Sequence, residues 1–199
     1  MNPSQALLIV DVQNDFCPGG ALAVPDGDKV VQVINQYVEF FKNTHSPVLA
    51  SRDWHPKNSR HFKDFGGVWP VHCVQNTFGA AFHPQLKLPN DAVIVSKGRA
   101  VDEDGYSAFQ ALDPKGDPFS QVLNQCGIKD LFVCGLATDY CVKASVLDAL
   151  KNKFNVYVLV DAIKGVNLKP KDSELALEQM KKSGAKELTY SQIELIPKR

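Results

Sequence analysis

The segment Leu131-Phe132-Val133-Cys134-Gly135-Leu136-Ala137-Thr138-Asp139-Tyr140-Cys141 joins a short apolar run to a stretch with helical periodicity. The apolar run, 131–134, predicts a buried strand, and residues 140–152 predict a helix that packs against it. Cys141 therefore falls in the first turn of a helix that directly follows a strand. The free backbone N–H groups and the positive end of the helix dipole favour a thiolate there, and the same groups can bind an oxyanion. This placement makes Cys141 a candidate nucleophile.

Further apolar runs with little polar alternation predict strands that are buried on both faces of a parallel sheet. They are residues 6–10, 47–50, 92–96 and 156–160, with a weaker strand expected near 187–189. Helical patterns separate them, at residues 28–43, 117–125, 140–152 and 170–184. This alternation predicts an α/β protein, a doubly wound three-layer fold whose mostly parallel central sheet is flanked by helices. Ligands of such folds bind outside the carboxyl ends of the strands.

Length and composition limit the broad class of protein. The 199 residues are 44% hydrophobic and show no linker or composition shift, so we expect residues 1–199 to form a single domain. The 22 basic and 22 acidic residues cancel, which predicts neither a nucleic-acid nor a membrane partner. Five irregularly spaced cysteines, without a signal-peptide or membrane-span pattern, predict a soluble cytoplasmic protein. Assembly into a homo-oligomer stays open.

Ionisable residues lie at or just beyond the ends of the predicted strands. Asp11, Asp53, His55 and Lys97 each follow an apolar run, as Cys141 does. The carboxyl ends of parallel strands share one edge of the sheet, so these side chains are expected to meet in one crevice. There Asp11 can act as general base on the thiol and then as acid toward the leaving group. Lys97 is expected to lower the thiol pKa and to balance the buried negative charge.

A long insertion, at about residues 51–91, has little regular periodicity and many Gly, Pro, His and aromatic residues. A loop of this length in a compact domain is usually functional. Beside Asp53 it holds three of the five histidines, His55, His61 and His72. Such oxygen and nitrogen ligands suit Zn²⁺, Fe²⁺ or Mn²⁺, and a set with no thiolate among its members does not resemble a structural zinc finger. Cys73 follows His72, but no second Cys pair supports a Cys/His zinc site. The insertion is therefore predicted to bind a divalent metal ion.

Four aromatic residues flank these motifs, namely Phe16, Trp69, Tyr106 and Tyr140. Aromatic side chains in loops commonly cover the edge of a core. Here they could equally line a pocket for a flat, ring-shaped ligand.

At these residues the chain resembles the nicotinamidases, also called pyrazinamidases, of the isochorismatase-like cysteine hydrolase superfamily. The resemblance covers nearly the whole length, and the superfamily as a whole shares the Asp, Lys and Cys. The Asp-x-His and Trp-Pro-x-His-Cys elements are more particular to nicotinamidases. The segments that carry the resemblance are Asp11–Phe16, Asp53–Pro56, Trp69–Thr77, Lys97-Gly98, Asp104–Phe109 and Gly135–Val142.

The resemblance implies a catalytic triad of Asp11, Lys97 and Cys141. It also implies a cis peptide bond between Leu136 and Ala137, which aims the N–H groups of Ala137 and Cys141 at one oxyanion. The substrate-binding residues that it implies are Phe16, Trp69, Tyr106, Leu136, Ala137 and Tyr140.

For the metal, the resemblance implies ligation by Asp53, His55 and His72, with a further ligand from the loop between them. Many relatives place a His six positions after the Asp and a Ser eight after it, whereas here the order is reversed as Ser59 and His61. Because other members carry the His at the later position, His61 is the expected fourth ligand. Zn²⁺ is the expected metal, with Fe²⁺ and Mn²⁺ as alternatives.

The implied reaction converts nicotinamide and water to nicotinate and ammonia through a thioester, as in NAD salvage, and also deamidates pyrazinamide. The nearest alternative is another amidase of the superfamily that acts on a carbamoyl or ureido group. An ether-cleaving isochorismatase does not need Cys141, and a redox role lacks a Cys-x-x-Cys motif. A dinucleotide-binding module lacks the Gly-x-Gly-x-x-Gly turn after the first strand. A purely structural metalloprotein would be indifferent to the loss of Cys141.

Overall fold

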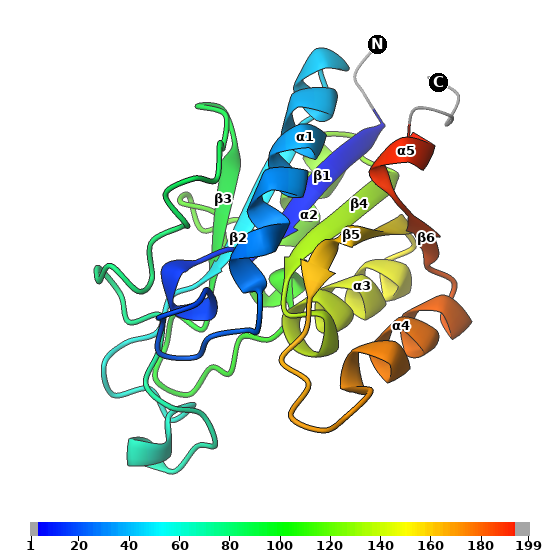
Figure 1. Ribbon diagram of the computed structural model, residues 1–199. Coiled ribbons are helices and arrows are strands. Elements are labelled where there is room, and N and C mark those ends of the chain that lie inside the picture. The colour runs from blue at the N-terminus through cyan, green and yellow to red at the C-terminus, as the bar shows by residue number, and fades with distance from the viewer. Residues whose placement is uncertain (1–3, 194–199) are drawn as a thin grey trace.

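The computed structural model describes residues 4–193, in which six strands form one parallel sheet of order β3-β2-β1-β4-β5-β6 (Figure 1). The strands are β1 (Gln5–Val10), β2 (Val48–Asp53), β3 (Val93–Lys97), β4 (Asp130–Leu136), β5 (Asn155–Lys164) and β6 (Lys186–Leu188). The helices are α1 (Val30–Asn43), α2 (Phe119–Gln125), α3 (Lys143–Lys151), α4 (Asp172–Lys182) and α5 (Tyr190–Ile193). The expected parallel α/β architecture is confirmed.

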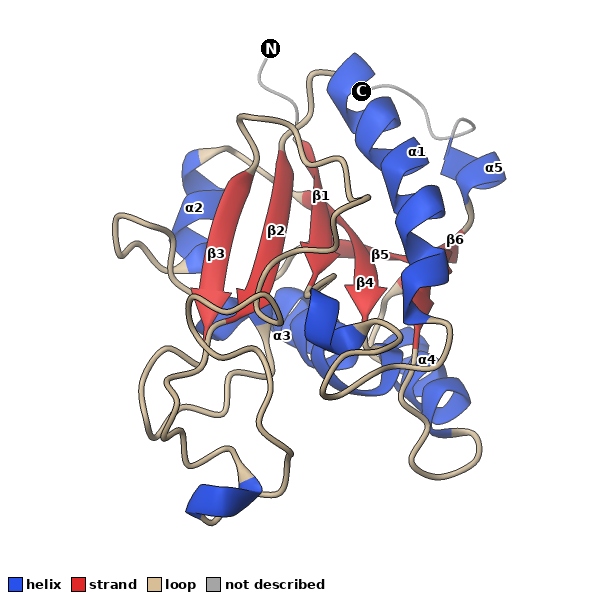
Figure 2. Cartoon of the chain, turned by 60° about the vertical axis from the view of Figure 1, so that its left-hand side comes forward, coloured by secondary structure: helices blue, strands red, loops and turns tan. Residues whose placement is uncertain are grey.

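Strand β1 shows why the apolar runs lack polar alternation. Successive side chains of a strand point to opposite faces of the sheet. Ala6, Leu8 and Val10 pack in a core with α2, α3 and α4, whereas Leu7 and Ile9 pack with α1 and α5. Helices thus cover both faces of the sheet, which makes three layers (Figure 2).

Strand β2 extends further than its apolar run, because two of its polar side chains are buried with partners. Ser51 Oγ donates to Asp11 Oδ1 at 2.7 Å, and Asp53 forms an ion pair with Lys97. The segment outside the regular strands therefore spans residues 54–92 rather than 51–91, and it contains one 3₁₀ turn at Lys63–Phe65. Isolated bridges between His55 and Val74 and between Phe62 and Trp69 fold this segment back on itself.

The nucleophile region differs from the expected α-helical first turn. A π-helical turn, Thr138–Val142, separates β4 from α3, and Cys141 lies within it. The Ala137 carbonyl accepts from the N–H group of Val142, five residues on, at 3.1 Å, and this bond widens the turn. The same carbonyl also accepts from the N–H group of Tyr140 at 3.0 Å. None of the helices in residues 4–193 is both long and apolar enough to span a bilayer.

The crevice of the sheet opens where the strand order reverses. From β1 the chain proceeds to β2 and β3 on one side, then returns to β4 on the other side of β1. Gly135 of β4 adopts φ +109°, and a Cβ there would lie 2.1 Å from the Val10 carbonyl oxygen. Glycine thus permits the close approach of β4 to β1. Asp11 and Cys141, which follow these two strands, lie at this switch point.

Candidate active site

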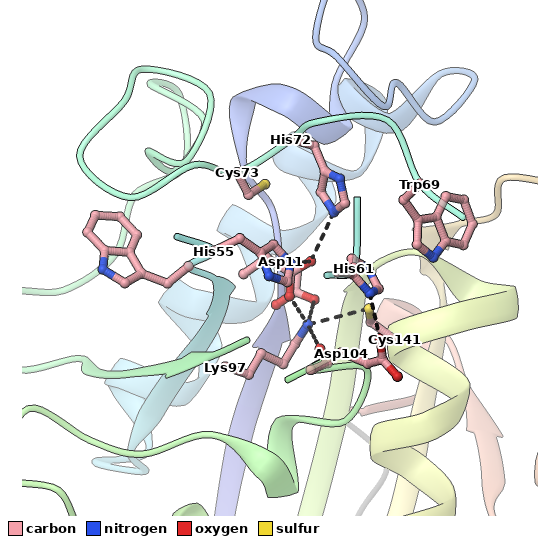
Figure 3. Close-up of polar contacts among 12 residues, drawn as sticks. Asp11, His55, His61, Trp69, His72, Cys73, Lys97, Asp104 and Cys141 are labelled. Carbon is pink, nitrogen blue, oxygen red and sulfur yellow. Dashed lines mark hydrogen bonds and ion pairs between the residues drawn. The ribbon is translucent and has the colours of Figure 1, made fainter. Parts of the chain in front are cut away.

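Asp11, Lys97 and Cys141 meet at the carboxyl edge of the sheet, as the sequence predicts (Figure 3). Lys97 Nζ lies 2.8 Å from Asp11 Oδ2 and 3.5 Å from Cys141 Sγ. A carboxylate oxygen of Asp11, one of Asp53 and the Cys141 sulfur all lie within 4.8 Å of one another. All four side chains are buried, so their charges interact strongly.

The Lys97 ammonium is shared between two carboxylates. Besides Asp11, it forms an ion pair and hydrogen bond with Asp53 Oδ1, and it donates to the Gly105 carbonyl at 2.6 Å. Although burial lowers the pKa of Lys97, the Asp11 and Asp53 carboxylates outweigh it and raise that pKa well above its ordinary value. Lys97 therefore stays charged and holds the two acids in place.

Burial outweighs the lowering of the Cys141 pKa that was expected from Lys97. Burial raises the pKa of Cys141 well above its ordinary value, and the nearby Lys97 ammonium only partly opposes this. Burial likewise raises the pKa of Asp11, against the same ammonium. Desolvation thus outweighs the expected effects of the helix start and the lysine. A thiol of this kind needs a base that removes its proton as it attacks.

A second cluster, formed by His55, His61 and His72, lies next to these residues. One ring nitrogen from each histidine lies within 4.8 Å of the others. Asp53 Oδ2 is 3.6 Å from His55 Nε2 and 3.7 Å from His72 Nε2. Asp53 therefore turns one oxygen to Lys97 and the other to the histidines. The three histidines form one group, and Asp53 lies beside two of them.

The hydrogen bonds of this histidine cluster suit a divalent cation. The carbonyl of Pro70 and the carboxylate of Asp104 can only accept, so the Nδ1 atoms of His72 (2.8 Å) and His61 (3.0 Å) donate to them. This leaves Nε2 of both rings free as a ligand. Within the described part of the chain, neither buried ring nitrogen of His55 has a hydrogen-bond partner.

Ser59 stands outside the cluster of ligands. Its buried hydroxyl accepts from the backbone N–H of His61 at 3.2 Å, so it supports the turn that carries this histidine. The reversed Ser and His order is thus accommodated locally. Burial lowers the pKa of His61, which favours the neutral ring that a metal requires.

A pocket of about 420 Å³ connects the thiol with the histidine cluster. This volume includes open solvent at the pocket mouth. Trp69 Nε1 donates to the Tyr106 hydroxyl at 2.8 Å. The Trp69 and Tyr140 rings pack edge to face, with their centroids 4.9 Å apart. The lining includes every expected pocket residue, namely Phe16, Trp69, Tyr106, Leu136, Ala137 and Tyr140, and adds Leu22, Val24, Asp104, Gly105 and Val166.

The peptide bond between Leu136 and Ala137 is cis, as expected from the resemblance. Ala137 and Cys141 both line the pocket, and the Ala137 N–H has no acceptor within residues 4–193. The buried carboxylate of Asp139 accepts from the N–H groups of Val166 at 2.9 Å and Asn167 at 2.7 Å. These bonds anchor the nucleophile turn to the segment that follows β5.

Two residues of the Asp11–Phe16 segment have structural roles that sequence reasoning missed. The Gln13 amide donates to the Asp53 carbonyl and accepts from the Asp53 N–H, both at 2.8 Å. Asp15 Oδ2 accepts from the N–H of Cys73, next to His72, at 2.7 Å. Both side chains therefore support the backbone of metal-ligand candidates. The available signal was the run of polar residues directly after a buried strand.

A doubly wound sheet with Cys, Asp and Lys gathered at its switch point defines an α/β cysteine hydrolase. Residues 5–192 match the isochorismatase domain, and the chain belongs to this family. It is 43% identical over 199 residues to the nicotinamidase of Escherichia coli (strain K12), covering 92% of this chain and 93% of that protein.

Solved structures extend this similarity. The pyrazinamidase of Pyrococcus horikoshii in complex with zinc has a TM-score of 0.87 and 48% identity, covering 94% of this chain and all (100%) of that chain. PnC1 from L. infantum in complex with nicotinate has a TM-score of 0.85 and 34% identity, covering 96% and 95% of the two chains. Homologous structures of this fold thus contain a zinc ion in one case and a pyridine carboxylate in the other.

Proposed function

We propose that this protein is a metal-dependent nicotinamidase, which hydrolyses nicotinamide to nicotinate and ammonia. The observation that carries the proposal is one aromatic-walled pocket with a thiol at one side and a cluster of three histidines, with Asp53 beside it, at the other. This pocket fits a flat ring that presents a carboxamide to the thiol and a ring nitrogen to a cation. Carbamoyl and ureido substrates have no such ring nitrogen. Nicotinate would then feed pyridine nucleotide synthesis, and pyrazinamide is a second expected substrate.

The first half of the reaction forms a thioester. Asp11 takes the Cys141 proton as the sulfur attacks the carboxamide carbon. The N–H groups of Ala137 and Cys141 stabilise the oxyanion, at about 3 kcal/mol for each well-placed donor. Asp11 then returns the proton to the departing nitrogen, so ammonia leaves and nicotinoyl–Cys141 remains. Lys97 keeps the charged partners of this step together.

The second half releases the product. Asp11 takes a proton from a water molecule as that water attacks the thioester carbon. The carbon–sulfur bond breaks, nicotinate leaves, and Cys141 regains its proton from Asp11. The raised pKa of Asp11, caused by burial, suits a group that both accepts and donates this proton.

Asp53, His55, His61 and His72 would hold the metal ion, with Zn²⁺ as the proposed species and Fe²⁺ and Mn²⁺ as alternatives. When bound, the ion acts as a Lewis acid that orients and polarises the substrate ring. Asp53 belongs to both the proposed ligand set and the Lys97 ion pair, so it would link the metal-binding residues to the residues around the thiol.

Ammonia release by the wild-type protein tests the proposal directly. With Zn²⁺, Fe²⁺ or Mn²⁺ supplied in turn, nicotinamide is expected to yield nicotinate and ammonia in equal amounts. A carbamoyl amino acid and a ureido compound serve as comparison substrates. Turnover of these compounds in place of nicotinamide would support the alternative amidase, and no turnover of any amide would overturn the proposed activity.

His72→Ala is expected to lose the metal and to raise the KM for nicotinamide. The reason is that the remaining set would lack a buried ligand, and we expect metal affinity to fall by at least ~10²-fold. The measurement is metal content after purification without chelator, followed by titration of the apoprotein. His83→Ala, which lies outside the cluster, should retain wild-type metal content. An unchanged affinity in His72→Ala would remove His72 from the ligand set.

A further inference from the structure

Three consecutive residues, Asp104-Gly105-Tyr106, contact three separate parts of the site. Asp104 Oδ1 accepts from His61 Nδ1, the Gly105 carbonyl accepts from Lys97, and the Tyr106 hydroxyl accepts from Trp69. Figure 3 shows the Asp104 carboxylate directed at the His61 ring. One short segment after β3 therefore touches the histidine cluster, the ammonium and the pocket wall.

The backbone of this segment is held in place although Asp104 itself is exposed. Gly105 adopts φ +70°, and a Cβ there would lie 2.5 Å from the Gly98 nitrogen, so only glycine fits this approach. Glu103 Oε2 accepts from the N–H of Arg99 at 2.8 Å, which closes the loop on itself. The Asp104 side chain is 69% exposed, and its Oδ1 lies 3.0 Å from Nδ1 of the buried His61 ring.

We propose that Asp104 is a positioning residue for His61, whose carboxylate holds the ring with Nε2 free for the metal. This inference rests on the metal site of the proposed function. Imidazole carries its single N–H on either nitrogen, and the acceptor at Nδ1 selects the tautomer whose Nε2 can ligate. His61 needs this contact because its other aromatic neighbours offer no acceptor to Nδ1. Its ring stacks on the His55 ring, with centroids 4.9 Å apart, and lies edge to face with the Tyr106 ring, with centroids 5.4 Å apart. Stacking does not distinguish the two ring nitrogens.

The same loop offers a matched control. Asp102 Oδ1 pairs with Arg60 at 2.7 Å, and both of these side chains are 71% exposed. Asp102 and Asp104 therefore carry equal charge in one loop, and they contact two adjacent residues, Arg60 and His61. Only Asp104 reaches a ligand candidate. Removal of either charge has a similar long-range effect, so the difference between the two variants isolates the contact with His61.

The experiment is a titration of Co²⁺ and Zn²⁺ into the apoproteins of wild type, Asp104→Ala, Asp104→Asn and Asp102→Ala. Affinity comes from competition with a chelator, and the visible absorption of bound Co²⁺ reports the coordination geometry. Asp104→Ala is expected to bind about 10–100-fold more weakly, with an altered Co²⁺ spectrum. Asp104→Asn should remain within about threefold of wild type, because its amide oxygen still accepts from Nδ1. Asp102→Ala should match wild type.

Wild-type affinity and spectrum in Asp104→Ala would overturn the proposal, as would an equal loss in Asp102→Ala. A loss in Asp104→Asn as large as that in Asp104→Ala would also overturn it, because Asp104 would then act as a charged ligand itself. A wild-type protein that binds no metal would overturn it as well. Metal titration does not depend on turnover, so a protein that binds metal but leaves nicotinamide intact would refute the activity alone.

Discussion

Replacement of Cys141 with alanine is expected to abolish ammonia release from nicotinamide while the fold and the metal site persist. The variant lacks the sulfur that lies 3.5 Å from Lys97 Nζ and within 4.8 Å of an Asp11 carboxylate oxygen, so the proposed thioester cannot form. Loss of a catalytic nucleophile commonly lowers kcat on the order of 10⁴-fold or more. Steady-state ammonia production, with metal content measured on the same sample, checks this expectation.

Cys134→Ala is the matched control for this prediction. Cys134 is a fully buried thiol in β4, the strand that leads to the nucleophile turn, and its sulfur lies 3.6 Å from the Leu8 carbonyl oxygen. Its truncation should change stability by about 1 kcal/mol and leave kcat near the wild-type value. Near-normal turnover in Cys141→Ala would refute the nucleophile assignment.

Lys97→Met is expected to lower both stability and turnover. The substitution keeps a similar volume but leaves the buried Asp11 and Asp53 carboxylates without their cation. Breaking a buried ion pair on one side commonly lowers the free energy of unfolding by about 3–5 kcal/mol. We also expect turnover to fall at least ~10²-fold, because Asp11 loses the charge that holds it ready as a base. Chemical denaturation of the metal-free proteins, with kinetics in parallel, measures both effects.

A second lysine and a double variant separate this effect from a general loss of charge. Lys151→Met removes an exposed lysine that pairs with Asp148, and it should alter stability by less than about 0.5 kcal/mol. Lys97→Met with Asp11→Asn should recover part of the stability that Lys97→Met loses, since one unpaired charge is removed as well. A double variant less stable than Lys97→Met would contradict the buried ion-pair account.

The core of the fold was predictable because a strand that is buried on both faces of the sheet consists of consecutive apolar residues. The runs at 6–10, 92–96 and 131–134 are nearly all apolar, and each overlaps a strand. Strand β2 was predicted too short, because Ser51 and Asp53 are buried through partners on distant segments. The pattern of apolar residues predicts which hydrophobic side chains are buried. It does not predict that a polar side chain is buried because a residue far along the chain forms a hydrogen bond or ion pair with it.

The sequence by itself determined the candidate nucleophile, base and metal-binding side chains, because residue types at strand ends report chemistry without any coordinates. Only the tertiary structure decided which of these groups contact each other. The register of β2 and β3 pairs Asp53 with Lys97, and Asp53 thereby joins the thiol site to the histidines. Folding also decided the net direction of the Cys141 pKa, because burial raises this pKa more than the Lys97 ammonium lowers it. In the folded protein, burial favours the protonated Cys141 thiol, which fits the expected role of Asp11 as its general base.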